Sequence, residues 1–129
     1  MIIAQLLNCL LSYPRQLADR NTFPDTAGFY AVATADAVRS NQITLVQVNG
    51  QSIILTRWQG ELLAFSNECP HASADLAEGD LHRGRITCPD HGYKFDIGNG
   101  RTLWPEDEVC RLKCYVVMEE NGTVKVRLT

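Results

Sequence analysis

Residues 67–96 read NECPHASADLAEGDLHRGRITCPDHGYKFD, and they contain two short motifs of the same kind. Cys69 and His71 form a Cys-x-His pair, and Cys88 and His91 form a Cys-x-x-His pair further along the chain. Because each pair is local in sequence, each loop can present both of its ligands to one point. Two thiolates and two imidazoles on paired loops are the ligands that a mixed-ligand [2Fe-2S] centre needs.

Proline follows each of the two cysteines directly, as Pro70 and Pro89. Proline fixes φ and stiffens a loop, which suits electron transfer because the ligands need not move between redox states. The main alternative is a structural zinc site with two Cys and two His. Zinc fingers usually pair Cys with Cys and His with His, so the mixed pairing disfavours zinc.

The sequence on both sides of these motifs is typical of antiparallel β-structure. Asn49-Gly50 and Asn121-Gly122 are strong signals for two-residue hairpin turns. Alternating and β-branched segments predict strands around these turns. The expected strands are 29–33, 43–48, 52–58, 61–66, 114–119 and 123–128, with one helical turn within 34–40. Residues 67–104 are expected to form paired loops around short strands.

The N-terminal segment has a different pattern, which predicts a short amphipathic helix. Its apolar residues fall on one helical face, and the helix is expected to end by Tyr13, before Pro14. The apolar run is too short to span a bilayer and has no positive residue ahead of it, so neither a membrane span nor a signal peptide is expected. We assign residues 1–20 as an N-terminal helix or extension. It packs on its own domain or offers a surface for a partner or for self-association.

Composition and charge narrow the class of protein further. The chain has 129 residues, with 45% hydrophobic and 21% charged residues and a net charge of −3, so one domain is expected and no nucleic-acid partner is indicated. The five cysteines are odd in number and irregularly spaced, which disfavours a disulfide framework. Metal ligation in a reducing compartment, the cytoplasm, is the better interpretation.

The two motifs and their flanking residues resemble those of Rieske proteins, and specifically of soluble Rieske-type ferredoxins. The resemblance covers roughly Gly28 to Leu128 and includes Phe65 to Glu68, Leu76 to Gly79 and Gly92 to Asp96. It implies an all-β fold, a Rieske-like antiparallel β-sandwich over residues 28–129 with an inserted cluster-binding loop subdomain over about 67–104. It also implies one [2Fe-2S] cluster per subunit. Cys69 and Cys88 would bind the inner iron, and His71 and His91 the outer iron near solvent.

Several residues depart from the quinol-oxidising members of that family. Those members carry a disulfide between the ligand loops, at positions that are Ala74 and Asp90 here. They also place serine and tyrosine hydroxyls near the cluster, at positions that are Tyr93 and Phe95 here. Hydrogen bonds to the cluster sulfur raise the potential, so we expect a value toward the low end of the Rieske range, roughly −150 mV. The family's usual glycine two residues after the first histidine is Ser73 in this chain.

The resemblance implies a function in electron transfer and no catalytic residues. We expect a one-electron carrier that accepts an electron from a flavin reductase and passes it to a terminal oxygenase. Acidic residues around the loops suggest a docking face for a basic partner; they are Glu68, Asp75, Glu78, Asp80, Asp90 and Asp96. Two alternatives stay open. One is a non-catalytic subunit of a reductase complex, similar to the small subunit of nitrite reductases, and the other is a redox sensor.

Overall fold

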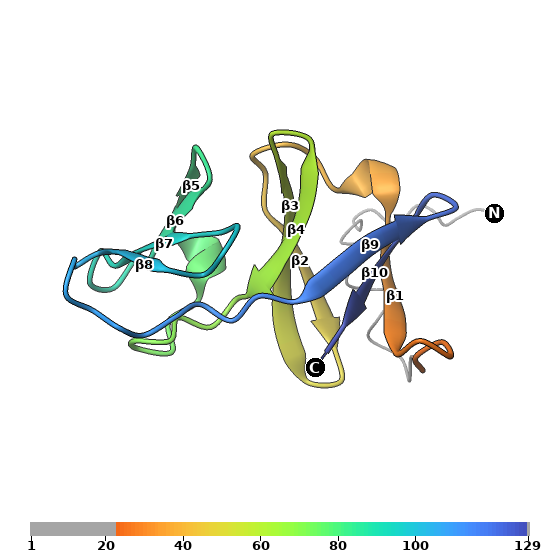
Figure 1. Cartoon of the computed structure of the whole chain (residues 1–129), viewed down its shortest axis with the longest axis horizontal. Helices are drawn as coiled ribbons and strands as arrows, with labels where there is room; N and C mark the ends of the chain where they lie inside the picture. Colours follow the sequence, from red (N-terminus) through yellow and green to blue (C-terminus); the bar gives the residue numbers. More distant parts are fainter. Residues whose placement is uncertain (1–22, 129) are drawn as a thin grey trace.

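The computed structural model describes residues 23–128, and in this part of the chain the regular structure is β apart from two 3-10 turns. These turns are η2 (Ala35–Ala37) and η3 (Leu76–Glu78). Ten strands form three antiparallel sheets (Figure 1). None of the helical segments described is long and apolar enough to cross a membrane.

Two three-stranded sheets pack face to face and form the larger part of the molecule, which we call the base (Figure 1). One sheet has the order β1-β10-β9, with β1 at Phe29–Thr34, β9 at Val116–Glu120 and β10 at Thr123–Arg127. The other has the order β2-β3-β4, with β2 at Thr44–Val48, β3 at Gln51–Trp58 and β4 at Glu61–Ser66. Alternate residues of β2 are buried, as period-2 patterning requires. The shared core includes Val32, Val46, Ile53, Leu55, Val124 and Val126.

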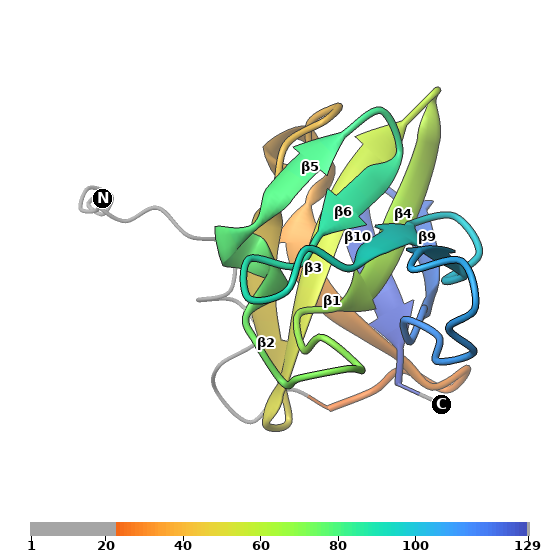
Figure 2. The same ribbon diagram turned by 90° about the vertical axis from the view of Figure 1, so that its left-hand side faces the viewer.

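The third sheet lies at one end of the molecule and faces the viewer in Figure 2. Its order is β5-β6-β7-β8, with β5 at Asp80–His82, β6 at Arg85–Thr87, β7 at Lys94–Asp96 and β8 at Thr102–Trp104. Ile86 and Phe95 pair across β6 and β7, and both side chains are fully buried. They belong to a second core that also contains Ile54 and Phe65 of the base sheets. The third sheet is therefore packed directly onto the base.

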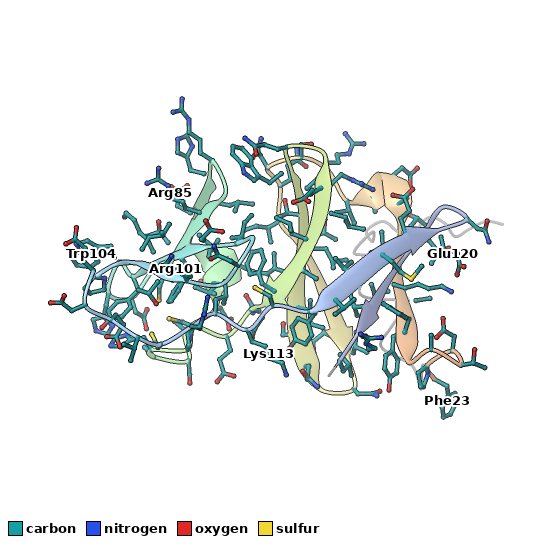
Figure 3. The ribbon with its side chains drawn as sticks, in the orientation of Figure 1. Phe23, Arg85, Arg101, Trp104, Lys113 and Glu120 are labelled. Atoms are coloured by element: carbon teal, nitrogen blue, oxygen red, sulfur yellow. The ribbon has the colours of Figure 1, made fainter. Side chains whose placement is uncertain are left out.

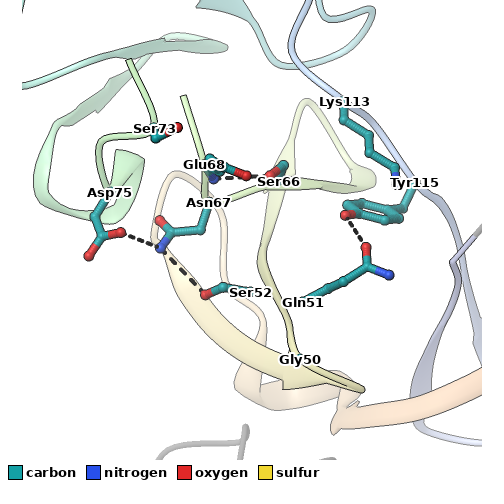
Figure 4. A pocket seen from close by; sticks show the side chains of 10 residues that line it. All are labelled: Gly50, Gln51, Ser52, Ser66, Asn67, Glu68, Ser73, Asp75, Lys113 and Tyr115. Atoms are coloured by element: carbon teal, nitrogen blue, oxygen red, sulfur yellow. Dashed lines mark hydrogen bonds between the residues drawn. The ribbon is translucent and has the colours of Figure 1, made fainter. Parts of the chain in front are cut away.

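Asn67 holds the first ligand loop against the base at the end of β4 (Figure 4). Its buried side-chain amide donates to Ser52 Oγ and to Asp75 Oδ1, both at 3.4 Å. Its side-chain carbonyl accepts a hydrogen bond from the Ala77 backbone N–H at 2.8 Å. One residue therefore ties together the base, the loop and the turn η3.

The fold confirms the all-β, antiparallel prediction and most of the expected strands. The three-strand meander over 43–66 and the hairpin across Asn121-Gly122 are both present. The expected helical turn is the short η2. Residues 67–104, expected as paired loops around short strands, contain the short strands β5 to β8, which pair into one four-stranded sheet. The predicted N-terminal helix lies outside the described residues.

Candidate metal centre

Two loops of matching backbone geometry carry the four predicted ligands. In the first loop the Cys69 N–H donates to Ala74 O at 2.9 Å, and the Ser73 N–H donates to Cys69 O at 2.8 Å. In the second loop the Cys88 N–H donates to Tyr93 O at 2.7 Å, and the Gly92 N–H donates to Cys88 O at 3.1 Å. Each loop therefore closes on itself through its cysteine, and the two cysteines are fixed in equivalent ways.

The two cysteine side chains lie together in the interior. Cys69 and Cys88 are each only 1% exposed and belong to the same core as Phe95 and Ile86. Burial raises the pKa of the Cys69 thiol, and the neighbouring Cys88 thiol raises it further, against backbone hydrogen bonds that lower it. A buried thiolate pair needs positive charge beside it, and metal ions supply that charge.

The two histidines lie side by side at the surface. His71 and His91 are exposed, and their ring centroids are 5.2 Å apart with the planes at 87°. The structure therefore brings together two buried thiols and two exposed imidazoles, which are the four predicted ligands.

Tyr93 and Glu108 lie next to His71. The sequence predicted no contact between Tyr93 and His71, and it gave Glu108 no role. The Tyr93 ring stacks on the His71 imidazole with centroids 3.9 Å apart and planes at 13°. Its hydroxyl donates to Glu108 Oε1 at 3.0 Å. This hydrogen bond lowers the pKa of Glu108, while partial burial and the same carboxylate raise the pKa of Tyr93.

Trp104 lies next to this group, at the end of the molecule away from the base (Figure 3). Its ring meets Tyr93 edge-on at 6.4 Å, and the side chain is 51% exposed. Trp104 therefore lies beside the predicted ligands and is not part of the core.

The other histidine and the other cysteines among residues 23–128 lie outside these two loops. His82 is exposed at the end of β5, beside Arg83 and Arg85. Cys110 and Cys114 are free thiols in the connection from β8 to β9. Among the residues that the structure describes, no three His, Cys, Asp or Glu side chains converge as a single metal ion would require. The four predicted ligands fit a binuclear group better, with the two thiols for one metal and the two imidazoles for the other.

Comparison with known proteins gives a consistent result. A family model described as Rieske [2Fe-2S] domain matches residues 28–116. The chain is 31% identical over 103 residues to the ferredoxin component of the naphthalene 1,2-dioxygenase/salicylate 5-hydroxylase systems of Ralstonia sp, covering 80% of this chain and 98% of that protein.

Two solved structures are similar in fold and sequence. The ferredoxin of carbazole 1,9a-dioxygenase from Nocardioides aromaticivorans IC177 superimposes with a TM-score of 0.69 at 29% identity, covering 77% of this chain and 96% of that one. A chain from the complex of reduced oxygenase and oxidized ferredoxin in carbazole 1,9a-dioxygenase gives a TM-score of 0.69 at 26% identity. That match covers 78% of this chain and 93% of the other.

Proposed function

The chain belongs to the Rieske [2Fe-2S] domain family, and we propose that it is a ferredoxin that carries one electron at a time from a flavin reductase to a terminal oxygenase. The observation that carries this proposal is the pair of matched loops, with two buried thiols and two exposed imidazoles. The related protein from Ralstonia is a ferredoxin component, and this chain covers 98% of its length. A similar solved chain comes from an oxygenase–ferredoxin complex.

Four residues would hold one [2Fe-2S] cluster per subunit. Cys69 and Cys88 would bind the inner iron, and His71 and His91 the outer iron. The cluster supplies a one-electron couple when it is bound. The protein buries the sulfur ligands away from water and leaves the imidazoles at the surface, so the electron has a short path to a docked partner.

The proposed domain limits follow from this assignment. The Rieske domain spans residues 28–129 as a β-sandwich, and the cluster-binding subdomain spans about 67–104. Cys110 and Cys114 lie outside the ligand loops and are free thiols, which a reducing compartment maintains, and this supports a cytoplasmic location.

Anaerobic purification with metal and sulfide analysis tests the ligand assignment. We expect iron and acid-labile sulfide in equal amounts, and a reduced-state electron paramagnetic resonance signal. Cys69→Ser and Cys88→Ser should each lose the cluster, because each removes a thiolate ligand. Cys110→Ser should keep it, since Cys110 lies outside the ligand loops. Stoichiometric zinc without visible absorption would overturn the proposal.

Reconstitution with a flavin reductase and a terminal oxygenase tests the carrier role. We expect substrate turnover to require this protein, with the rate of electron transfer falling steeply as salt is added. Exposed Glu68 and Asp90 lie within or beside the ligand loops and would attract a basic partner. A turnover rate that does not depend on the protein would contradict the carrier role.

A further inference from the structure

The two predicted histidine ligands have different surroundings. The His71 imidazole has an almost parallel tyrosine ring on one face, at 3.9 Å and 13°. His91 meets His71 edge-on, and the described residues give it no stacked aromatic partner. The His71 ring is therefore more restricted in its rotation than the His91 ring.

The tyrosine that stacks on His71 is itself held at its far end. Tyr93 lies two residues after His91, directly before β7, and its hydroxyl donates to Glu108 Oε1 at 3.0 Å. Glu108 lies in the connection after β8, where its own backbone N–H donates to Pro105 O at 3.2 Å. Trp104 packs edge-on against the same tyrosine. Tyr93 is therefore fixed from two sides, which makes its stack on His71 a defined contact.

We propose that Tyr93 and Glu108 are positioning residues for His71, and that they set the reduction potential and the orientation of that ligand. This inference rests on the proposed function, in which His71 binds the outer iron. The stack holds the imidazole plane, so that the ligand does not rotate when the charge of the cluster changes. The Glu108 carboxylate places a negative charge near His71, beyond the stacked Tyr93 ring, and would so oppose the electron added to the outer iron.

The two effects are separable because the chain allows each group to be changed alone. Glu108→Gln removes the charge and keeps an oxygen that can accept from Tyr93. Tyr93→Phe keeps the stacked ring and removes the hydrogen bond. Tyr93→Leu removes the stack. Glu106→Gln is the matched control, because Glu106 is an exposed acid in the same connection.

Protein-film voltammetry on the cluster-loaded protein measures the charge effect. We expect Glu108→Gln to raise the reduction potential at least about twice as much as Glu106→Gln does. Coulomb energy increases as the distance between charges falls, and Glu108 is the acid that contacts Tyr93 beside His71. Equal shifts for the two variants would overturn the role of Glu108.

Pulsed electron paramagnetic resonance measures the orientation effect through the nitrogen hyperfine couplings of the two histidines. We expect Tyr93→Leu to change or broaden the coupling of one histidine only, and Tyr93→Phe to change it less. Unchanged couplings in Tyr93→Leu would overturn the positioning role. If Tyr93→Leu loses its cluster, the test rests on Tyr93→Phe. A wild-type spectrum in Tyr93→Phe would then overturn the role of the Tyr93 hydroxyl in positioning His71, and an altered spectrum would support that role. Wild-type protein without iron and sulfide would instead refute the proposed function.

Discussion

Ser73 and Gly92 occupy the same position in the two ligand loops. Each lies four residues after a predicted ligand cysteine, and the backbone N–H of each donates to that cysteine's carbonyl oxygen. Both have positive φ, 58° at Ser73 and 73° at Gly92. Glycine adopts this conformation without steric cost, whereas serine does not. The first loop therefore keeps the geometry of the second at a cost in stability.

Replacing Ser73 with glycine should stabilise the protein. Relief of the left-handed conformation outweighs the larger entropy of glycine in the unfolded chain, so we expect a gain of roughly 0.5–1 kcal/mol in the free energy of unfolding. Urea unfolding of the purified protein measures it. Gly92→Ser should have the opposite sign, and its cost should come from φ alone, because a Cβ at Gly92 meets no atom within 4 Å.

Ala72→Gly is the matched control for this pair, because it adds a glycine at the residue before Ser73, where φ is not positive. We expect it to destabilise the protein by about 0.5–1 kcal/mol. Destabilisation of the same size by Ser73→Gly would show that Ser73 is not strained.

Gly79 has a different reason for being glycine, which is space. Its φ of −90° is open to any residue, but a Cβ there would overlap with the carbonyl oxygen of Thr87. Because Thr87 directly precedes Cys88, relief of the overlap would displace a predicted ligand. We expect Gly79→Ala to lower the free energy of unfolding by about 1–3 kcal/mol and to reduce the iron content per chain.

Gly98→Ala provides the comparison for Gly79→Ala. A Cβ at Gly98 would approach only the side-chain oxygen of Asp96, at 3.2 Å, and φ is not in the left-handed region. We expect a smaller loss of stability and an unchanged iron content. Equal effects of the two substitutions would contradict the close approach at Thr87.

The base sheets were predictable from the sequence because their signals are local. Asn49 and Gly50 have φ of 49° and 82°, as the hairpin turn that they predict requires. The third sheet was not predictable in the same way, since its strands have three residues each and show no period. Its pairing depends on the register between Ile86 and Phe95, which only the folded chain shows.

The ligand residues were recognisable from their spacing, whereas their neighbours were not. Glu108 meets Tyr93 because the connection after β8 returns past the ligand loops, and no local pattern indicates this. Asp96, one of the acids of the predicted docking face, also accepts hydrogen bonds from the N–H groups of Gly98 and Asn99, which the sequence did not indicate. Its carboxylate therefore shapes a turn.

Asn67 should be important for stability, because its buried amide connects three segments. Asn67→Ala leaves the Ala77 N–H without its acceptor, so we expect a loss of about 1–3 kcal/mol in the free energy of unfolding. Thermal or urea unfolding measures this loss. Gln42→Ala changes an exposed residue of the base and should have little effect. A loss at Asn67 no larger than that at Gln42 would refute the role of this contact.

Phe95 offers a test of the predicted low potential. Its ring is fully buried in the same core as Cys69 and Cys88, at the position where the quinol-oxidising relatives carry a tyrosine hydroxyl. We expect a wild-type potential of roughly −150 mV. Phe95→Tyr adds a donor that favours the reduced, more negative cluster. A hydrogen bond worth about 1 kcal/mol corresponds to an upward shift of about 40 mV for a one-electron couple.

Phe29→Tyr is the control for the added hydroxyl, because Phe29 lies on β1 in the base, away from the ligand loops. We expect voltammetry to give this variant the wild-type potential. Comparing iron content first ensures that both variants carry the cluster. A Phe95→Tyr potential equal to the wild-type value, or below it, would mean that missing hydrogen-bond donors do not explain the low potential.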